Sequence, residues 1–103
     1  MNNQVTKQLL EMEDLDNSFK HKLKRIQQQE YFKRTNAERF SDLTKREVEI
    51  IILVANDFKN PQIAEMLFIS RFTVEQHRKN INKKLEVNSY AQLLQFALAF
   101  DLI

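Results

Sequence analysis

The chain has 103 residues, 43% of them hydrophobic, which is enough for one modest core and leaves no length for a second independent domain. It contains no cysteine, no glycine and one proline, which excludes disulfide frameworks, cysteine-based metal sites and glycine-rich phosphate loops. The formal net charge of +2 is too small to indicate nucleic acid by itself. The distribution of charge along the chain is therefore more informative than its total.

The start of the chain lacks the pattern of an export signal. No basic start is followed by a long apolar stretch, and nowhere do about 18 uncharged apolar residues run together. Acids instead gather there, at Glu11, Glu13, Asp14 and Asp16. We therefore expect a soluble, cytoplasmic protein with no membrane partner.

Residues 5–26 carry apolar side chains at spacings of three, four or seven, with no proline or glycine between them. This periodicity predicts an amphipathic helix. Asp16 and Glu30 fall where a coiled-coil seam requires apolar residues, so we expect a short dimerising helix or one packed on the rest of the chain. The polar residues 27–42 either extend this helix or connect it to the next.

A helix start is predicted at Thr44, because Glu47 follows three residues later and completes a capping box. The run IIILV at residues 50–54 has strand propensity. Periodicity nevertheless favours a mostly buried helix over residues 44–56, because one set of apolar side chains shares a face. That set is Val48, Ile51, Ile52 and Ala55.

A second, short helix is predicted to open with Asn60 as N-cap and Pro61 at its first position. A turn at Phe68 and Ile69 should separate it from the next helix, which Ser70 should cap. The residues that this second helix is expected to bury are Ile63, Ala64 and Leu67.

The third helix, at about residues 71–86, has two distinct faces. At about 100° per residue, Ile81 and Leu85 fall within about 20° of Val74, which defines the core direction. Five lysines and arginines stand against one acid between residues 71 and 84. A helix held by its apolar stripe leaves its other face free to enter a major groove. That outer face carries Phe72, Gln76, Lys79 and Lys83.

A last helix is predicted from Tyr90 to about Phe100, after a cap at Asn88 or Ser89. It is apolar on more than one side, and one core cannot use all of that surface, so we expect a second copy to cover the rest. The alternative is that this helix and the N-terminal helix pack on each other in a monomer. The expected dimer contacts are Leu93, Leu94, Ala97 and Phe100.

Four segments follow one another in order within residues 43–98: LTKREVEII, NPQIAEMLFIS, TVEQHRKNI and KKLEV. Together they resemble the LuxR-type (GerE/FixJ-like) helix-turn-helix of bacterial transcription regulators. The resemblance implies an all-α fold, with a four-helix LuxR-type domain at residues 43–103 and an N-terminal helical extension at residues 1–42. It also implies that the third helix lies in the major groove of double-stranded DNA and that the fourth forms the usual dimer contact.

The resemblance also implies functional residues. For Arg78 we expect either a contact with a DNA phosphate or an internal ion pair with a glutamate of the helix at residues 44–56. Phe72 is expected to pack on Leu67 or Phe68 rather than touch a thymine methyl group. Carried over position by position, base contacts fall to Glu75, Gln76 and Lys79, and backbone contacts to Thr73 and Lys83. Arg78 is a further candidate backbone contact because it lies near the edge of the core face.

The chain departs from the family at Asp57 and Glu86, where glycine commonly ends a helix in the left-handed conformation. Glutamate tolerates this conformation poorly, so the third helix either continues past Leu85 or ends with strain. Glu75 replaces a residue that is often basic, which predicts an altered site preference rather than lost binding. With only about 42 residues before the domain, the chain resembles standalone members without a receiver or ligand domain.

Nothing in the chain indicates catalysis, a metal or a cofactor. His21 and His77 stand far apart without cysteine, and His77 is expected to be structural. No nucleophile is joined to a base and an orienting group.

From the family resemblance we predict a homodimeric, sequence-specific DNA-binding transcriptional regulator without a small-molecule ligand. The alternatives are an adaptor or antagonist that binds another regulator through its terminal helices, and a domain resembling the promoter-reading part of a sigma factor.

Overall fold

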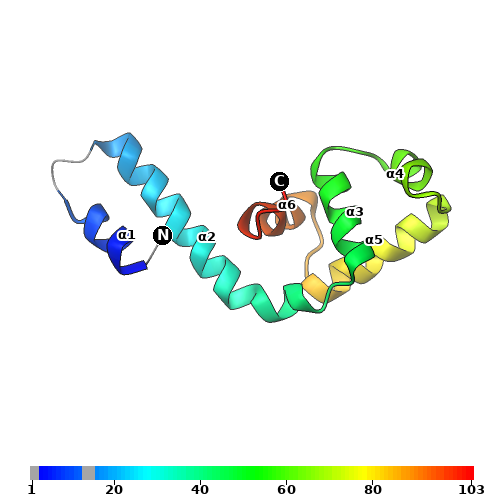
Figure 1. The fold of residues 1–103 in the computed structure, drawn as a ribbon, viewed down its shortest axis with the longest axis horizontal. Helices are drawn as coiled ribbons and strands as arrows, with labels where there is room; N and C mark the ends of the chain where they lie inside the picture. The colour runs from blue at the N-terminus through cyan, green and yellow to red at the C-terminus, as the bar shows by residue number, and fades with distance from the viewer. Residues whose placement is uncertain (1–2, 13–15) are drawn as a thin grey trace. The chain divides into compact units, whose positions relative to one another are not determined.

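The computed structural model describes residues 3–12 and 16–103 (Figure 1). These residues form helices joined by short connections and contain no strand, so the predicted all-α class is confirmed. Within the described ranges, no helix is long and apolar enough to cross a bilayer. The helices are α1 (Asn3–Leu10), α2 (Asn17–Ser41), α3 (Lys45–Ala55), α4 (Asn60–Leu67), α5 (Arg71–Leu85) and α6 (Tyr90–Ala99).

Contacts between residues of the chain divide the protein into two compact units, Met1–Thr35 and Asn36–Ile103. The division falls inside α2. The first unit holds α1 and most of α2. The second unit holds the last turns of α2 and the helices α3 to α6. The expected domain boundary, between residues 42 and 43, lies in the connection from α2 to α3.

The first unit contains two helices, so the prediction of one helix over residues 5–26 is wrong. The new helix starts after Asp16, whose Oδ1 accepts a hydrogen bond from the Phe19 backbone N–H at 2.9 Å. A carboxylate in this position satisfies a free donor of the first helical turn, as an N-cap does. The helix then continues through residues 27–41, which therefore extend it. Two of the clustered acids, Glu13 and Asp14, lie outside the described residues.

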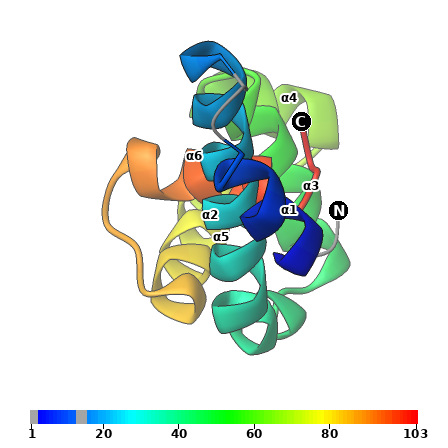
Figure 2. The same ribbon diagram turned by 90° about the vertical axis from the view of Figure 1, so that its left-hand side faces the viewer.

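In this unit α1 lies alongside the first half of α2, as both views show (Figure 1, Figure 2). Each helix contributes one fully buried side chain. Thr6 of α1 and Leu23 of α2 are each 1% exposed. The other apolar residues of this unit that the structure describes are partly exposed, so this is a small core.

In the second unit, α3 begins with the predicted capping box. The Glu47 backbone N–H donates to Thr44 Oγ1 at 3.1 Å, and the Thr44 N–H donates to Glu47 Oε1 at 2.8 Å. Together these bonds satisfy two donors at the start of α3, which runs as a helix despite its β-branched sequence. The predicted helix type is confirmed.

The buried face of α3 differs from the predicted one. Ile51 is buried, but Val48, Ile52 and Ala55 are only half-buried. Both α5 and α6 pack against this helix, so its core-facing stripe is set by two neighbours that periodicity alone does not locate. The residues that α3 buries are Glu47, Ile50, Ile51 and Val54.

α4 begins one residue earlier than predicted, and Asn60 is its first residue rather than its N-cap. The N-cap is Lys59, whose backbone N–H donates to Gln62 Oε1 at 2.8 Å. Pro61 is accommodated because a first-turn N–H needs no helical partner. Two of the three expected core residues, Ile63 and Ala64, are buried.

α5 follows the prediction closely. Ser70 caps it by accepting a hydrogen bond from the Thr73 N–H at 3.0 Å. Its inner stripe of Val74, Ile81 and Leu85 is at most 1% exposed. Burial of this stripe against α3 and α4 stabilises the helix by about 1.5–3 kcal/mol per side chain, which holds its outer face in a fixed orientation.

α6 is capped by Ser89, which accepts a hydrogen bond from the Gln92 N–H at 3.2 Å. Near the end of α6, the Phe100 ring stacks on Phe40 with 4.0 Å between centroids and 8° between planes. This stack joins the end of α2 to the last helix inside the second unit. The residues of α6 that are buried are Leu93, Phe96, Ala97 and Ala99.

Candidate nucleic-acid interface

The outer face of α5 is polar and exposed, opposite the buried stripe. Glu75, Gln76, Lys79 and Lys83 are all exposed, and no carboxylate of the described chain pairs with either lysine. The side chains are thus available to an external partner. They extend over about two turns of a helix that is capped at its start and buried on its other side.

Thr73 lies at the beginning of this face and is half-buried. Its Oγ1 is 2.9 Å from Ser70 Oγ, so the two hydroxyl groups share a hydrogen bond at the N-cap. His77 is half-buried on the same helix, as expected of a structural side chain. The start of the helix is therefore rigidly held by its own polar groups.

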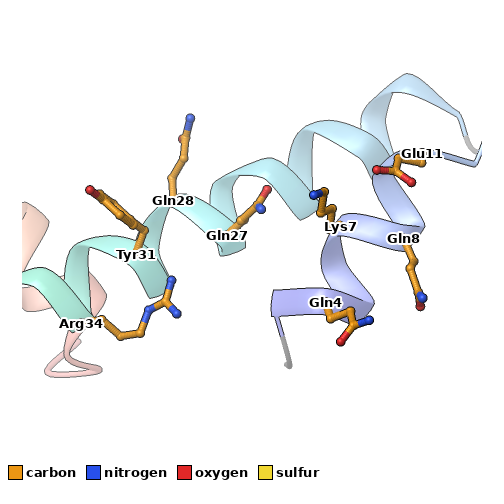
Figure 3. A pocket seen from close by; sticks show the side chains of 8 residues that line it. All are labelled: Gln4, Lys7, Gln8, Glu11, Gln27, Gln28, Tyr31 and Arg34. Atoms are coloured by element: carbon orange, nitrogen blue, oxygen red, sulfur yellow. The ribbon is translucent and has the colours of Figure 1, made fainter.

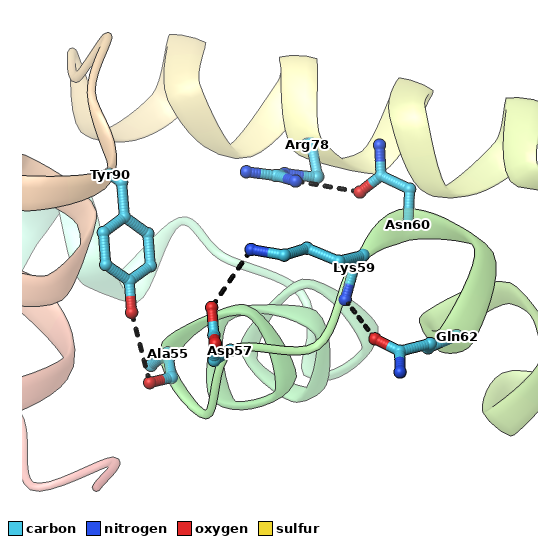
Figure 4. A network of polar contacts seen from close by, with 7 residues as sticks. All are labelled: Ala55, Asp57, Lys59, Asn60, Gln62, Arg78 and Tyr90. Atoms are coloured by element: carbon cyan, nitrogen blue, oxygen red, sulfur yellow. Dashed lines mark hydrogen bonds and ion pairs between the residues drawn. The ribbon is translucent and has the colours of Figure 1, made fainter.

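Arg78 is half-buried and points to α4, where its Nη1 donates to Asn60 Oδ1 at 2.8 Å (Figure 4). The alternative of an ion pair with a glutamate of α3 is therefore wrong. Guanidinium has five N–H donors, and this bond uses one of them. Arg78 consequently ties the start of α4 to the middle of α5 and retains donors for a second acceptor.

Glu47 of α3 pairs instead with Lys84, and the sequence did not predict this contact. Lys84 Nζ lies 2.7 Å from Glu47 Oε1, and the Glu47 side chain is 3% exposed. Burial by itself raises the pKa of Glu47, but hydrogen bonds from Lys84 and from the Thr44 backbone, with the Lys84 charge, lower it below its ordinary value. A helical wheel places Lys84 about 80° from Val74, at the edge of the core face. This position is the sequence feature that indicates a contact with the core.

The connection between α3 and α4 is held by polar contacts (Figure 4). Asp57 adopts φ 69°, the conformation for which the family commonly uses glycine, and its Oδ1 lies 3.1 Å from Lys59 Nζ. Tyr90 Oη donates to the Ala55 carbonyl oxygen at 3.4 Å. The Tyr90 contact joins α6 to the end of α3, and the exposed Asp57 and Lys59 pair lies within the connection itself.

Two aromatic side chains border the start of α5 and face solvent. Phe68 is 95% exposed in the left-handed conformation, and Phe72 is 67% exposed. The expected packing of Phe72 on Leu67 or Phe68 is therefore wrong. Phe72 lies about 160° from Val74 around the helix, so this apolar side chain shares the outer face of α5 with Gln76.

The four expected dimer contacts divide into two groups. Leu93 and Ala97 are 4% and 0% exposed and belong to the core, and Phe100 stacks on Phe40. Leu94 is half-buried, and its neighbour Leu98 is 44% exposed. Only the Leu94 and Leu98 side of α6 offers substantial surface to a second chain.

A groove of about 750 Å³ lies within the first unit, between α1 and α2 (Figure 3). Its lining consists of long polar side chains, among them Lys7 of α1 and Gln27 and Tyr31 of α2. No group of three histidines, cysteines or acids that could hold a metal ion occurs in the described part of the chain. The groove gives no indication of a specific ligand.

A short helix, a turn and a capped second helix with a free polar face define a helix-turn-helix protein of the DNA-binding class. The family model described as bacterial regulatory proteins, luxR family, matches residues 41–97, more than half of the chain. The chain belongs to this luxR family. The resemblance read from its four sequence segments is confirmed.

Curated relatives include the oxygen regulatory protein NreC of two staphylococci. The protein of Staphylococcus carnosus is 44% identical over 64 residues, which are 62% of this chain and 30% of the relative. The protein of Staphylococcus epidermidis is 41% identical over 69 residues, which are 67% of this chain and 32% of the relative. The chain thus matches about a third of the length of these relatives.

Proposed function

We propose that this chain is a sequence-specific DNA-binding transcriptional regulator that acts as a homodimer, with α5 in the major groove of each half-site. The observation that carries this proposal is the outer face of α5. Gln76, Lys79 and Lys83 project from it, while the opposite stripe of the helix is almost completely buried. A helix held in this way presents base-reading side chains from a backbone that loses little freedom on binding.

Each proposed base contact has a chemical preference. Gln76 can bond both N6 and N7 of adenine, and Lys79 can donate to O6 and N7 of guanine. Glu75 repels phosphate but can accept a hydrogen bond from the N4 amino group of cytosine. Together these residues support discrimination between base pairs, in addition to the phosphate neutralisation that supplies most of the affinity.

The proposed backbone contacts are Thr73, Arg78 and Lys83. Lys83 is exposed and can approach a phosphate directly. Arg78 can do so while keeping its bond to Asn60, because its remaining N–H donors are not used by that contact. Phosphate contacts of this kind fix the orientation of the reading helix but carry no sequence information.

For the dimer, we propose that a second copy covers the exposed side of α6 at Leu94 and Leu98. Leu93 and Ala97 then act by supporting this surface from the core. A two-fold dimer would present two copies of α5 to an inverted repeat. Replacing Leu98 with glutamate should give a monomer in sedimentation analysis and weaken binding to the repeat more than binding to a single half-site.

The test of the proposed function is selection of bound duplexes from a random library at near-physiological salt. Wild type should enrich an inverted repeat, and the Gln76→Ala, Lys79→Ala variant should not. A Lys45→Ala, Gln95→Ala variant is the matched control, because it removes the same residue types from exposed positions outside α5 and should retain the repeat. Failure of wild type to enrich any sequence would contradict the proposal.

A second candidate is an adaptor that binds another regulator through its terminal helices. The observation that favours it is the exposed apolar surface at the C-terminal end, where Leu98 and Ile103 are 44% and 48% exposed. An adaptor would form a stable complex with its partner without DNA. It would show no preferred duplex in the selection.

A further inference from the structure

The first half of α2 is strongly basic. Residues 17–29 contain Lys20, Lys22, Lys24 and Arg25 and no acid. The flanking Asp16 uses its carboxylate to cap the helix at the Phe19 N–H. Among the described residues, no carboxylate pairs with any of the four cations. This segment therefore carries four uncompensated charges on one short stretch of helix.

Three of these four charges occupy the side of the helix that faces away from Leu23. At about 100° per residue, Lys22 and Lys24 lie about 100° to either side of Leu23, and Arg25 lies about 160° from it. All three are exposed, whereas Lys20 is half-buried nearer the core side. We refer to Lys22, Lys24 and Arg25 as the cationic arc of α2.

The opposite side of α2 is apolar and only partly covered, because Phe19 and Ile26 on it are 41% and 38% exposed. Leu23 is 1% exposed, as is Thr6 of α1, the other helix of this unit. A basic amphipathic helix can bind an anionic membrane through its apolar side or a polyanion through its charged side. The cationic arc lies on the other side of α2 from this stripe and is exposed, so a polyanion can reach it without displacing α1.

We propose that the cationic arc binds the phosphate backbone of the same duplex that α5 reads, as a second contact outside the helix-turn-helix. This inference rests on the proposed function of α5. Lysine and arginine are the side chains that neutralise phosphates, and no acid within the segment opposes them. Since α2 and α5 belong to one chain, a contact of the arc with the same duplex needs no second bimolecular association step.

The test is the salt dependence of binding by the full chain. In the variant Lys22→Gln, Lys24→Gln, Arg25→Gln, each replacement is an exposed residue exchanged for a good helix former. Each lost phosphate contact should reduce the slope of log K against log salt by about 0.9, so the slope should fall by about 2–3. The fall should be equal on the selected duplex and on an unrelated duplex of the same length.

Two controls separate charge from structure. The variant Lys22→Arg, Lys24→Arg, Arg25→Lys keeps the charges and should keep the slope. Far-ultraviolet circular dichroism of both variants should match that of wild type. If the glutamine variant has the wild-type slope, the proposed arc contact is wrong.

The outcomes distinguish this inference from the proposed function. If wild type reads a specific duplex and the glutamine variant leaves the slope unchanged, only the arc contact fails. If wild type prefers no sequence but the variant still lowers the slope, the arc binds phosphate and the proposed function fails. Vesicles containing phosphatidylserine provide the remaining arm: arc-dependent binding to vesicles with no change in the DNA slope would overturn the proposal in favour of a membrane surface.

Discussion

Lys84 Nζ of α5 lies 2.7 Å from Glu47 Oε1 of α3, and the same carboxylate oxygen accepts the Thr44 backbone N–H at 2.8 Å. One buried carboxylate therefore caps α3 and holds α5 against it. The position of the proposed reading helix depends on a residue at the start of another helix, 37 positions earlier in the chain. A change at either partner should alter both stability and the orientation of α5.

Replacing Lys84 with methionine should destabilise the fold by about 1–3 kcal/mol, because the Glu47 carboxylate would stay buried with only its capping bonds. Methionine keeps an unbranched apolar stem as far as Cε and removes only the charged end of the lysine. Chemical denaturation measures the loss. Lys83→Met is the matched control, since Lys83 is exposed, and its effect should stay within about 0.5 kcal/mol. Equal effects of the two changes would show that the buried pair does not contribute.

Acid should weaken the fold through Glu47. Its pKa in the folded protein lies below the ordinary value of 4.5, so the unfolded chain binds the proton more readily. The stabilisation is complete above pH 4.5 and is lost as the pH falls through the folded pKa. Urea unfolding of wild type and Glu47→Gln from pH 7 to pH 3 should show a stability difference that is largest at pH 7 and shrinks below pH 4.5. A difference that is constant with pH would contradict this assignment.

The end of α5 carries conformational strain at Glu86, which has φ 55° and ψ 46°. A left-handed conformation costs a residue other than glycine about 1–2 kcal/mol. Glu86 also pairs with Arg39 at 2.7 Å, but both side chains are well exposed and such a pair contributes about 0–1 kcal/mol. Glu86→Gly and Glu86→Ala both remove the pair, so the glycine variant should be the more stable by about 1–2 kcal/mol in thermal unfolding.

Local signals were the part of this fold that the sequence predicted well. The capping box of Thr44 and Glu47, the Ser70 cap and the inner stripe of α5 depend on residues within one or two helical turns. The same locality explains the predicted start of α6 at a serine cap. The outer face of α5 followed from its inner stripe, because the two faces of one helix are related by a fixed angle.

Predictions that depended on partners far along the chain were less accurate. The buried face of α3 is set jointly by α5 and α6, and periodicity does not specify two neighbours. Arg78 and Lys84 are both near the edge of the core face, and only the fold decides that the first meets Asn60 and the second Glu47. The sequence pattern places Asp16 as a break in an apolar seam, whereas its side chain caps a new helix.

Asn60→Ala tests the structural role of Arg78. Loss of the acceptor should destabilise the fold by about 0.5–1.5 kcal/mol and leave DNA affinity almost unchanged, because the arginine can still reach a phosphate. Arg78→Gln should weaken binding to every duplex by the same factor if Arg78 contacts the backbone. Denaturation and binding measurements on both variants separate the two roles. Unchanged affinity in Arg78→Gln would restrict Arg78 to its contact with α4.

Lys79→Ala should reduce binding to the preferred duplex by about 1–3 kcal/mol if Lys79 donates to guanine, and the loss on unrelated sequences should be much smaller. Lys83→Ala is the internal comparison, because Lys83 lies on the same exposed face one turn further along. A phosphate contact there should weaken all duplexes equally and reduce the salt slope by about 1. Each of the two variants loses one positive charge. A difference between them in sequence preference therefore reports base recognition alone. An equal loss for Lys79→Ala on every duplex would make it a phosphate contact and leave discrimination to Gln76 and Glu75.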